Sequence, residues 1–174
     1  MSQANKSVNE LNADLFAPEE TGGCADPKEA RRKAMDCLAR REYGQRELIQ
    51  KLETAGYDAL LALQTVEQLT MEGLQDDRRF IESFAQSRIN QGKGPIRLHA
   101  DLRQRGIDTR LIDEVLQGLS TDWRALAREV RQKKFGPAVP RSFAEKAKQM
   151  RFLQYRGFAQ AQIESAVGDR GDDY

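Results

Sequence analysis

Hydrophobic positions recur along most of this chain with the spacing of a helix. In the segments 60–69, 111–119 and 163–167, apolar residues stand three or four positions apart, which places them on one face of an amphipathic helix. The alternation of apolar and polar residues that marks a half-buried strand does not occur over any useful length, and the chain has only five prolines. The pattern therefore predicts an all-α protein.

One short pattern occurs three times in the chain. A leucine stands four positions before a glycine, and a bulky apolar residue follows the glycine directly. The three copies are Leu52, Gly56 and Tyr57, then Leu102, Gly106 and Ile107, then Leu153, Gly157 and Phe158, so the glycines are 50 and 51 positions apart. A glycine just beyond a helix end can adopt the left-handed conformation that closes the last turn. A repeated unit of helix, glycine turn and helix is thus expected.

Signals for helix starts agree with this repeat. The expected N-cap residues are Asp26 (followed by Pro27), Asp58 and Asp108, with Ala159 as a weaker start in the third copy. Gly44 and Gly94 each lie twelve positions before a repeat glycine. Gly44 is a passable N-cap with Glu47 placed as in a capping box, and Ser142 with Glu145 has the full capping-box spacing.

A further helix precedes each copy, over about residues 27–41, 76–90 and 122–134. The side chains predicted to face inward on these helices are Ala30, Ala34, Met35, Leu38, Phe80, Ile81, Phe84, Ile89, Trp123, Leu126 and Val130. On the helices after the glycines they are Leu60, Leu63, Val66, Leu69, Leu111 or Ile112, Val115, Leu116, Leu119, Ile163, Ala166 and Val167.

The predicted architecture is three tandem three-helix repeats that form an elongated, curved array. The repeats are expected at residues 26–72, 73–119 and 120–168. A flexible acidic arm is expected at residues 1–25 and an acidic tail at residues 169–174.

The small net charge conceals a separation of charges along the chain. The formal net charge is +1, but residues 1–26 carry five acidic residues against one lysine, and the last seven carry three against one arginine. The segment between them therefore has a clear excess of positive charge. A basic body between acidic ends suggests that the body binds an anionic partner.

Several classes of protein are excluded by what the chain lacks. It has no apolar run long enough for a transmembrane helix and no signal-peptide pattern, and its two cysteines lack metal-site spacing, so a cytoplasmic protein is expected. His99 is the only histidine and has no partners for a metal site or a triad. Gly92-Lys93-Gly94 lacks the full phosphate-loop motif and a preceding strand. We expect no catalytic site, no metal and no cofactor.

Basic residues are the better candidates for a functional surface, and most lie in the second and third repeats. The candidates for contact with a partner or with DNA are Arg40, Arg41, Arg97, Arg103, Arg105, Arg131, Lys133, Lys134, Lys148, Arg151 and Arg156. Cations at helix C-termini also complement the helix dipole, so a merely solvated face is the alternative. Tyr155 stands among these cations and could stack on a base, although packing against a helix is the expected role.

Three motifs in this order and register resemble the RecX family, bacterial regulators of the RecA recombinase. The first runs from Leu38-Ala-Arg-Arg-Glu42-Tyr43 to Gly56-Tyr57 and the second from Asp76-Asp77 through Gly92-Lys-Gly94-Pro95 to Gly106-Ile107. The third joins Lys134-Phe-Gly136 to Arg151-Phe-Leu153 and Gly157-Phe158. Gly44 and Ala159 depart from the usual capping residues of the family.

This resemblance implies a function that periodicity alone does not reach. RecX-like proteins bind the RecA–single-stranded DNA filament in its groove and inhibit strand exchange, ATP hydrolysis and co-protease activity. The implied partners are the RecA filament and single-stranded DNA, contacted directly or through the filament, and we expect a monomer. The alternatives are a helical DNA-binding protein that acts independently of RecA and a helical scaffold for another protein.

Overall fold

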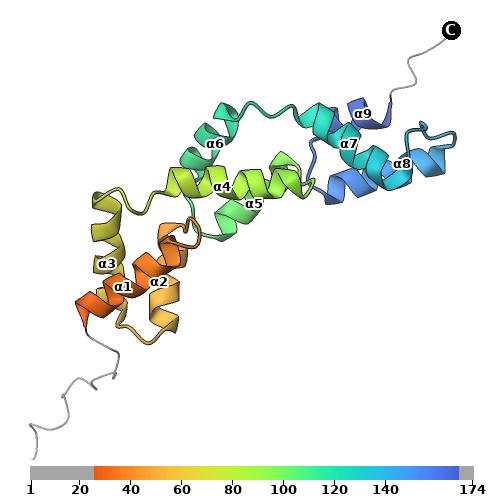
Figure 1. Cartoon of the computed structure of the whole chain (residues 1–174). Coiled ribbons are helices and arrows are strands. Elements are labelled where there is room, and N and C mark those ends of the chain that lie inside the picture. Colours follow the sequence, from red (N-terminus) through yellow and green to blue (C-terminus); the bar gives the residue numbers. More distant parts are fainter. Residues whose placement is uncertain (1–25, 169–174) are drawn as a thin grey trace, which may run out of the picture.

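A computed structural model describes residues 26–168, which fold into nine helices and contain no strand (Figure 1). Repeat 1 consists of α1 (Pro27–Leu38), α2 (Gln45–Thr54) and α3 (Ala59–Met71). Repeat 2 consists of α4 (Asp77–Asn90), α5 (Pro95–Gln104) and α6 (Thr109–Gly118), and repeat 3 of α7 (Trp123–Phe135), α8 (Phe143–Tyr155) and α9 (Gln160–Val167). The prediction of an elongated all-α array of three-helix repeats is confirmed. The predicted acidic arm and tail lie outside the described residues.

Side-chain caps define where most of the helices begin. Six helices follow a residue whose side chain accepts a hydrogen bond from a first-turn amide, namely Asp26, Asp58, Asp76, Asp108, Asp122 and Ser142. The weak start at Ala159 is supported by Gln162, whose side-chain oxygen accepts from the Ala159 amide at 2.8 Å. Gly44 is the N-cap of α2 as expected, but its capping-box partner is wrong, because Glu47 accepts from Arg41 and Arg105 instead.

The three repeat glycines close the middle helices as predicted. Gly56, Gly106 and Gly157 have φ values of 94°, 81° and 86°, in the left-handed region that glycine reaches without a steric penalty. The amide after each glycine donates to the carbonyl of the leucine: Tyr57 to Leu52 at 3.2 Å, Ile107 to Leu102 at 3.3 Å and Phe158 to Leu153 at 3.2 Å. This is the hydrogen bond of a Schellman motif, so the same helix end is built three times.

Each repeat encloses a hydrophobic cluster of its own. Repeat 1 buries Ala34, Tyr43, Leu48, Leu52, Ala62, Val66 and Leu69. Repeat 2 buries Phe80, Ile81, Leu102, Ile107, Ile112 and Val115, and repeat 3 buries Ala127, Val130, Leu153, Phe158, Ile163, Ala166 and Val167. The leucine and the bulky residue of the repeated pattern belong to these clusters, except that Tyr57 is only partly buried against its own.

Some predicted inward positions in repeat 1 are wrong. Leu60, Leu63 and Met35 are 61%, 40% and 37% exposed. The buried face of α3 instead passes through Ala62, Thr65, Val66 and Leu69. Buried alanines on α1 and α3 let these two helices pack closely, so the larger side chains at neighbouring positions are displaced to the edge of the contact.

The first helix is shorter than predicted. It ends at Leu38 rather than near Arg41, and the chain then turns so that Tyr43 reaches the core.

Repeats 2 and 3 meet through the backbone. The Gly94 amide donates to the Arg156 carbonyl at 2.9 Å, and the Ile96 amide donates to the Gly157 carbonyl at 3.0 Å. Amides in the first turn of a helix and carbonyls in the last turn have no partner within their own helix. The start of α5 and the end of α8 therefore satisfy each other. A Cβ atom at Gly94 would overlap the Gly157 carbonyl.

Repeats 1 and 2 meet at the corresponding place but through side chains. A Cβ atom at Gly44, before α2, would lie 3.0 Å from Cδ1 of Ile107, which follows the glycine turn of repeat 2. The Gln45 amide donates to Oδ1 of Asp77 at 2.8 Å, and buried Gln75 donates to the same oxygen and to the Tyr43 carbonyl. In both junctions the middle helix of one repeat starts beside the end of the middle helix of the next.

Replacing Gly94 with alanine should destabilise the array by about 1–3 kcal/mol, the usual cost of overpacking a close contact. The φ of Gly94 is −83°, so the loss would come from the clash with Gly157 and not from backbone strain. Urea denaturation measures the stability, and small-angle scattering should detect a changed angle between repeats.

Gly118→Ala is the matched control, because a Cβ atom there meets nothing within 4 Å. Because it replaces a helical glycine, it should leave stability unchanged or raise it by up to about 1 kcal/mol. Equal stability of the two variants would show that repeats 2 and 3 do not depend on this contact.

Candidate anion-binding surface

The predicted basic residues fall into three groups according to their surroundings. One of them, Arg131, is only 3% exposed and does not lie on the surface. Its guanidinium donates to the carbonyls of Pro137 and Ala138, at 3.2 and 2.9 Å, and to Oε1 of Gln149 at 3.3 Å. Arg131 thus holds the α7–α8 loop in place, and its assignment to an exposed basic face is wrong.

A second group is exposed or half-buried but already engaged within the chain. Arg41 and Arg105 both contact Glu47, with N–O distances of 2.6 and 3.3 Å, and the guanidinium of Arg41 lies 3.5 Å from the centre of the Tyr43 ring. The hydrogen bond with Glu47 raises the pKa of Arg41. Lys133 pairs with Glu129 at 2.6 Å. These charges are partly neutralised before any partner arrives.

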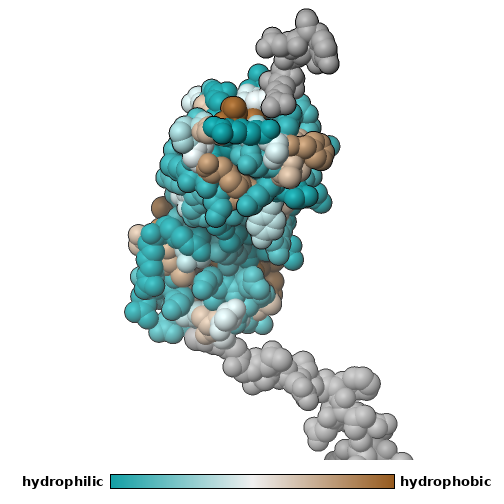
Figure 2. Space-filling view, turned by 90° about the vertical axis from the view of Figure 1, so that its right-hand side faces the viewer, coloured by the Kyte–Doolittle hydropathy of each residue, from teal (hydrophilic) through white to brown (hydrophobic). Residues whose placement is uncertain are grey.

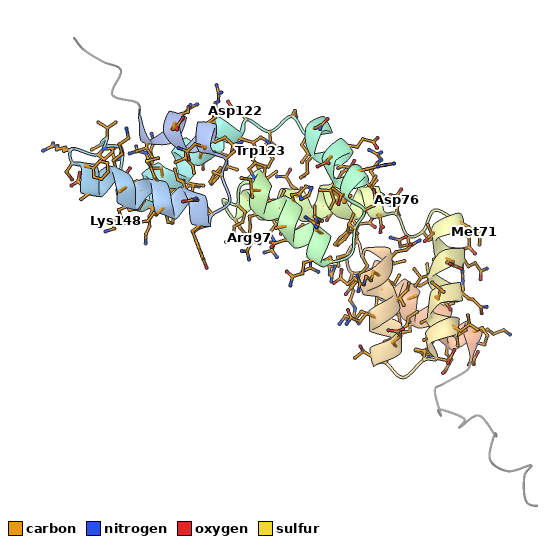
Figure 3. The ribbon with its side chains drawn as sticks, turned by 180° about the vertical axis from the view of Figure 1, so that it is seen from behind. Met71, Asp76, Arg97, Asp122, Trp123 and Lys148 are labelled. Carbon is orange, nitrogen blue, oxygen red and sulfur yellow. The ribbon has the colours of Figure 1, made fainter. Side chains whose placement is uncertain are left out.

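Arg97 and Arg156 belong to this second group and meet at the junction of repeats 2 and 3. Arg97 lies 3.0 Å from Asp101 and packs against the backbone of Gly157. Arg156 donates to the Gln91 carbonyl at 2.9 Å and lies over the Phe152 ring. Figure 3 shows Arg97 at the start of α5, where the end of α8 approaches it.

The third group is exposed and forms no ion pair within residues 26–168: Arg40, Arg103, Lys134, Lys148 and Arg151. Three of these five lie on α7 and α8, and Lys148 lies on the outer side of the array (Figure 3). Repeat 3 therefore carries most of the predicted cations that are free to bind an anion.

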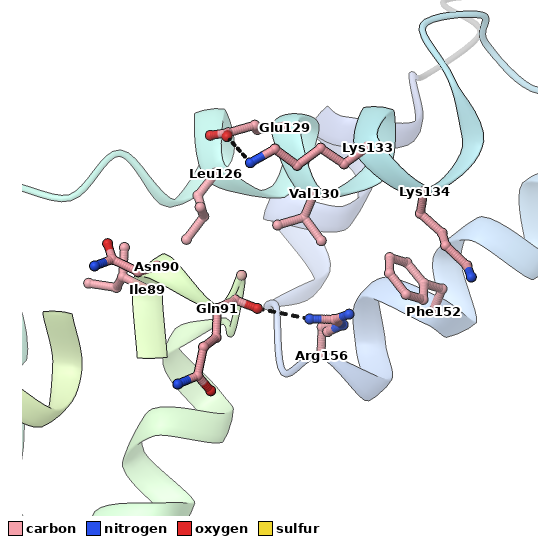
Figure 4. Close-up of a pocket in the computed structure, with 11 residues that line it drawn as sticks. Ile89, Asn90, Gln91, Leu126, Glu129, Val130, Lys133, Lys134, Phe152 and Arg156 are labelled. Carbon is pink, nitrogen blue, oxygen red and sulfur yellow. Dashed lines mark hydrogen bonds and ion pairs between the residues drawn. The ribbon is translucent and has the colours of Figure 1, made fainter. Parts of the chain in front are cut away.

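A cleft of about 650 Å³ separates repeats 2 and 3 (Figure 4). Its lining combines the apolar side chains of Ile89, Leu126, Val130 and Phe152 with Asn90, Gln91, Gly92, Glu129, Lys133, Lys134 and Arg156. Lys133 forms an ion pair with Glu129, one turn earlier on the same helix. Lys134 lies beside Phe152 and has no carboxylate partner among the described residues. The cleft thus offers positive charge next to apolar surface, a combination suited to recognition through contacts and charge.

Two residues near this cleft are absent from the predicted set. Arg88 and Lys93 lie on either side of the turn at Gly92, and the charges of Arg88, Arg97 and Arg156 all act on Lys93. The sequence motif Gly92-Lys93-Gly94 marks this turn, but it is not a phosphate loop, and nothing else in the local sequence singles out the lysine. Arg156 comes from repeat 3, more than sixty positions later, so local sequence gives no sign of it.

The chain's one histidine lies next to a carboxylate. His99 Nε2 lies 3.2 Å from Oδ1 of Asp113 on the next helix, beside a second cleft that includes Ile96 and Trp123. No group of three or more metal-ligating side chains occurs among residues 26–168.

None of the described helices combines the length and apolarity needed to cross a membrane. Figure 2 shows the end of the array near repeat 3, where hydrophilic residues cover most of the face and hydrophobic ones form small separate patches.

Comparison with protein families matches two parts of the chain. The family model described as "RecX, second three-helix domain" matches residues 76–116, and "RecX, third three-helix domain" matches residues 122–167. These ranges correspond to the helices of repeats 2 and 3.

Individual relatives and solved structures agree with these matches. The chain is 44% identical to "Regulatory protein RecX" of Halorhodospira halophila over 80% of this chain and 87% of that protein. It is 42% identical to the protein of that name from Pseudomonas entomophila, over 83% and 93%. The crystal structure of RecX from Lactobacillus salivarius has a TM-score of 0.68 at 19% identity, covering 81% of this chain and 94% of that one, and thus shares the fold.

Arg131→Ala should lower stability, because its removal leaves two loop carbonyls and Gln149 without a donor. A loss of about 1–3 kcal/mol is expected, because Gln149 is buried and its side-chain oxygen would lose its donor. Lys134→Ala, three positions later on the same helix but exposed, should change stability by less than about 0.5 kcal/mol. Urea denaturation compares the two, and a neutral Arg131→Ala would contradict the structural role.

Proposed function

The chain belongs to the RecX family of regulatory proteins, and from this premise we propose that it is a negative regulator of the RecA recombinase. It binds the RecA–single-stranded DNA filament in the filament groove. Binding inhibits strand exchange, ATP hydrolysis and the co-protease activity of the filament. The protein acts in the cytoplasm as a monomer, with no cofactor and no catalytic step of its own.

The observation that carries this proposal is the combination of an elongated shape with unpaired cations. Arg40 follows α1 in repeat 1, Arg103 lies on α5 in repeat 2, and Lys134, Lys148 and Arg151 lie in repeat 3. A filament presents identical subunits and DNA phosphates at regular intervals. Weak contacts at successive repeats then add, because the first contact raises the effective concentration of the next.

An array that bridges several RecA subunits would also explain how the protein inhibits the filament without a catalytic step of its own. Strand exchange and ATP turnover require the filament to change its internal geometry, and a stiff ligand that fits one state stabilises that state. The backbone contact between repeats 2 and 3 supports such stiffness, since the Gly94 and Ile96 amides are fixed to the end of α8.

Binding to DNA independently of RecA is the second candidate, favoured by the basic body. The helices that follow the glycine turns argue against this candidate. On α6, Asp113 and Glu114 are exposed, and Glu114 already pairs with Arg78 at 2.6 Å. A helix with these acidic groups would be repelled by the phosphates that flank the major groove.

The direct test is RecA-dependent ATP hydrolysis on single-stranded DNA with amounts of this protein below those of RecA. We expect slower hydrolysis. Hydrolysis at the uninhibited rate would contradict the proposed function.

The contribution of repeat 3 is tested by the double variant Lys148→Glu/Arg151→Glu. If each charge reversal removes about 0.5–1 kcal/mol of interaction, the concentration for half-inhibition should rise about tenfold, with a weaker dependence on salt. The matched control is Arg110→Glu/Arg124→Glu, which makes the same change of charge at exposed first-turn positions of α6 and α7. Equal effects of the two pairs would mean that only the total charge matters.

A further inference from the structure

Four cations from two repeats gather around the turn that joins α4 to α5. Arg88 lies in the last turn of α4, Lys93 lies in the connecting turn, Arg97 lies in the first turn of α5, and Arg156 follows α8. The Arg156 guanidinium is fixed by the Gln91 carbonyl and lies 3.8 Å from the position of a Cβ atom at Gly92. The backbone of Arg97 packs against Gly157. We call these four residues the junction cluster.

The junction cluster is short of negative charge. Asp101 is the one carboxylate that pairs with it among the described residues, at 3.0 Å from Nε of Arg97 and 3.8 Å from Nε of Arg88. The Nε atom of Arg88 is buried and has no hydrogen-bond acceptor within residues 26–168. Lys93 and Arg156 have no paired carboxylate within residues 26–168. Four cations against one carboxylate therefore leave an excess of three positive charges in one place.

The electrostatics of Lys93 agree with this excess. Partial burial lowers the pKa of the Lys93 ammonium, and the charges of Arg156, Arg97 and Arg88 lower it further, while Asp101 opposes them. A bound anion would therefore stabilise the charged form of Lys93. The backbone contacts of the junction hold the four cations close together despite their mutual repulsion, and a bound anion would offset that repulsion.

Two exposed side chains are sequence neighbours of cations in the junction cluster. Tyr155, 80% exposed, directly precedes Arg156, and Ile96, 58% exposed, directly precedes Arg97. The Ile96 amide donates to the Gly157 carbonyl, so the two residues belong to segments in contact. Packing against a helix is the role that the sequence predicts for Tyr155, but that prediction is wrong, because the side chain is left open to solvent.

We propose that the junction cluster binds the phosphodiester backbone of single-stranded DNA and that Tyr155 stacks on a neighbouring base. Guanidinium groups bind phosphate oxygens in a forked geometry, and an aromatic ring beside a cationic groove is the usual platform for single strands. An acidic protein segment would satisfy the charges but would gain nothing specific from the ring. The site rests on the proposed function for its biological setting and deepens it by assigning the DNA strand to a particular place.

The site exists only when repeats 2 and 3 are docked. Lys93 and Arg97 come from one repeat, and Tyr155 and Arg156 come from the other. The glycines at positions 94 and 157 let the two segments approach closely enough for these side chains to share one ligand. A bound strand would in turn fix the angle between the two repeats.

The test is fluorescence anisotropy of a labelled oligothymidylate of about 20 nucleotides with the full chain at about 50 mM salt, where phosphate contacts are weakly screened. Lys93→Glu should weaken binding about tenfold and reduce the slope of log K against log salt by about 0.7 for each phosphate that the protein no longer neutralises. Tyr155→Ala should weaken binding at least about fivefold, while Tyr155→Phe, which keeps the ring, should bind nearly as the parent does. Arg110→Glu is the control for charge.

Both Lys93 and Tyr155 can be replaced without opening a hydrophobic cluster, and urea denaturation verifies that each variant is folded. The proposal is overturned if the parent chain does not bind the oligonucleotide, or if folded Lys93→Glu and Tyr155→Ala variants bind it as tightly as the parent. It is also overturned if both changes weaken binding to polyglutamate but leave oligonucleotide binding intact, since the ligand would then be an acidic polypeptide.

The same variants separate this site from the proposed function. If the parent fails to slow RecA-dependent ATP hydrolysis while oligonucleotide binding still depends on Lys93 and Tyr155, the proposed function fails and the site stands. If hydrolysis is slowed but oligonucleotide binding is indifferent to both residues, the site fails and the proposed function stands.

Discussion

The structure depends on the contact between the start of one middle helix and the end of the next. A unit of three short helices buries little apolar surface and is marginally stable by itself, so stacking on a neighbour stabilises each repeat. Between repeats 2 and 3, the free amides at the start of α5 donate to the free carbonyls at the end of α8. Two helix ends that would otherwise need water or side-chain caps thereby become an interface, and glycine is required because any side chain at position 94 would keep them apart.

The two junctions use the same geometry with different chemistry. Between repeats 1 and 2 the contact passes through Ile107 and a polar group around Gln75 and Asp77, whereas between repeats 2 and 3 it is backbone to backbone. Side chains can adjust their rotamers, but a backbone contact cannot relax without moving a whole helix. The geometry between repeats 2 and 3 is therefore the more firmly fixed, and the cations beside it have the better-defined positions.

The sequence predicted those features that depend on residues close together in the chain. The turns at Gly56, Gly106 and Gly157 and the caps at Asp58 and Asp108 follow from local backbone preferences, and all are present. What the sequence could not supply was the neighbour from another repeat. Gly44 is the N-cap of α2, but the sequence did not reveal that a Cβ atom there would lie 3.0 Å from Cδ1 of Ile107 in the next repeat. Likewise, Arg131 belongs to a basic run, but the loop that it holds becomes visible only when α7 and α8 pack together.

Shape and charge are consequently not separate properties of this chain. Most of the predicted cations cluster in sequence, but the junction cluster contains Lys93 and Arg88, which stand outside those runs. These residues meet Arg156 only because the Gly157 turn reaches the start of α5. A change that loosened the junction would disperse the cations without removing any of them, so the ability to hold an anion depends on the same glycines that define the repeat. For an array of this kind, positions without side chains determine where the charged side chains can act together.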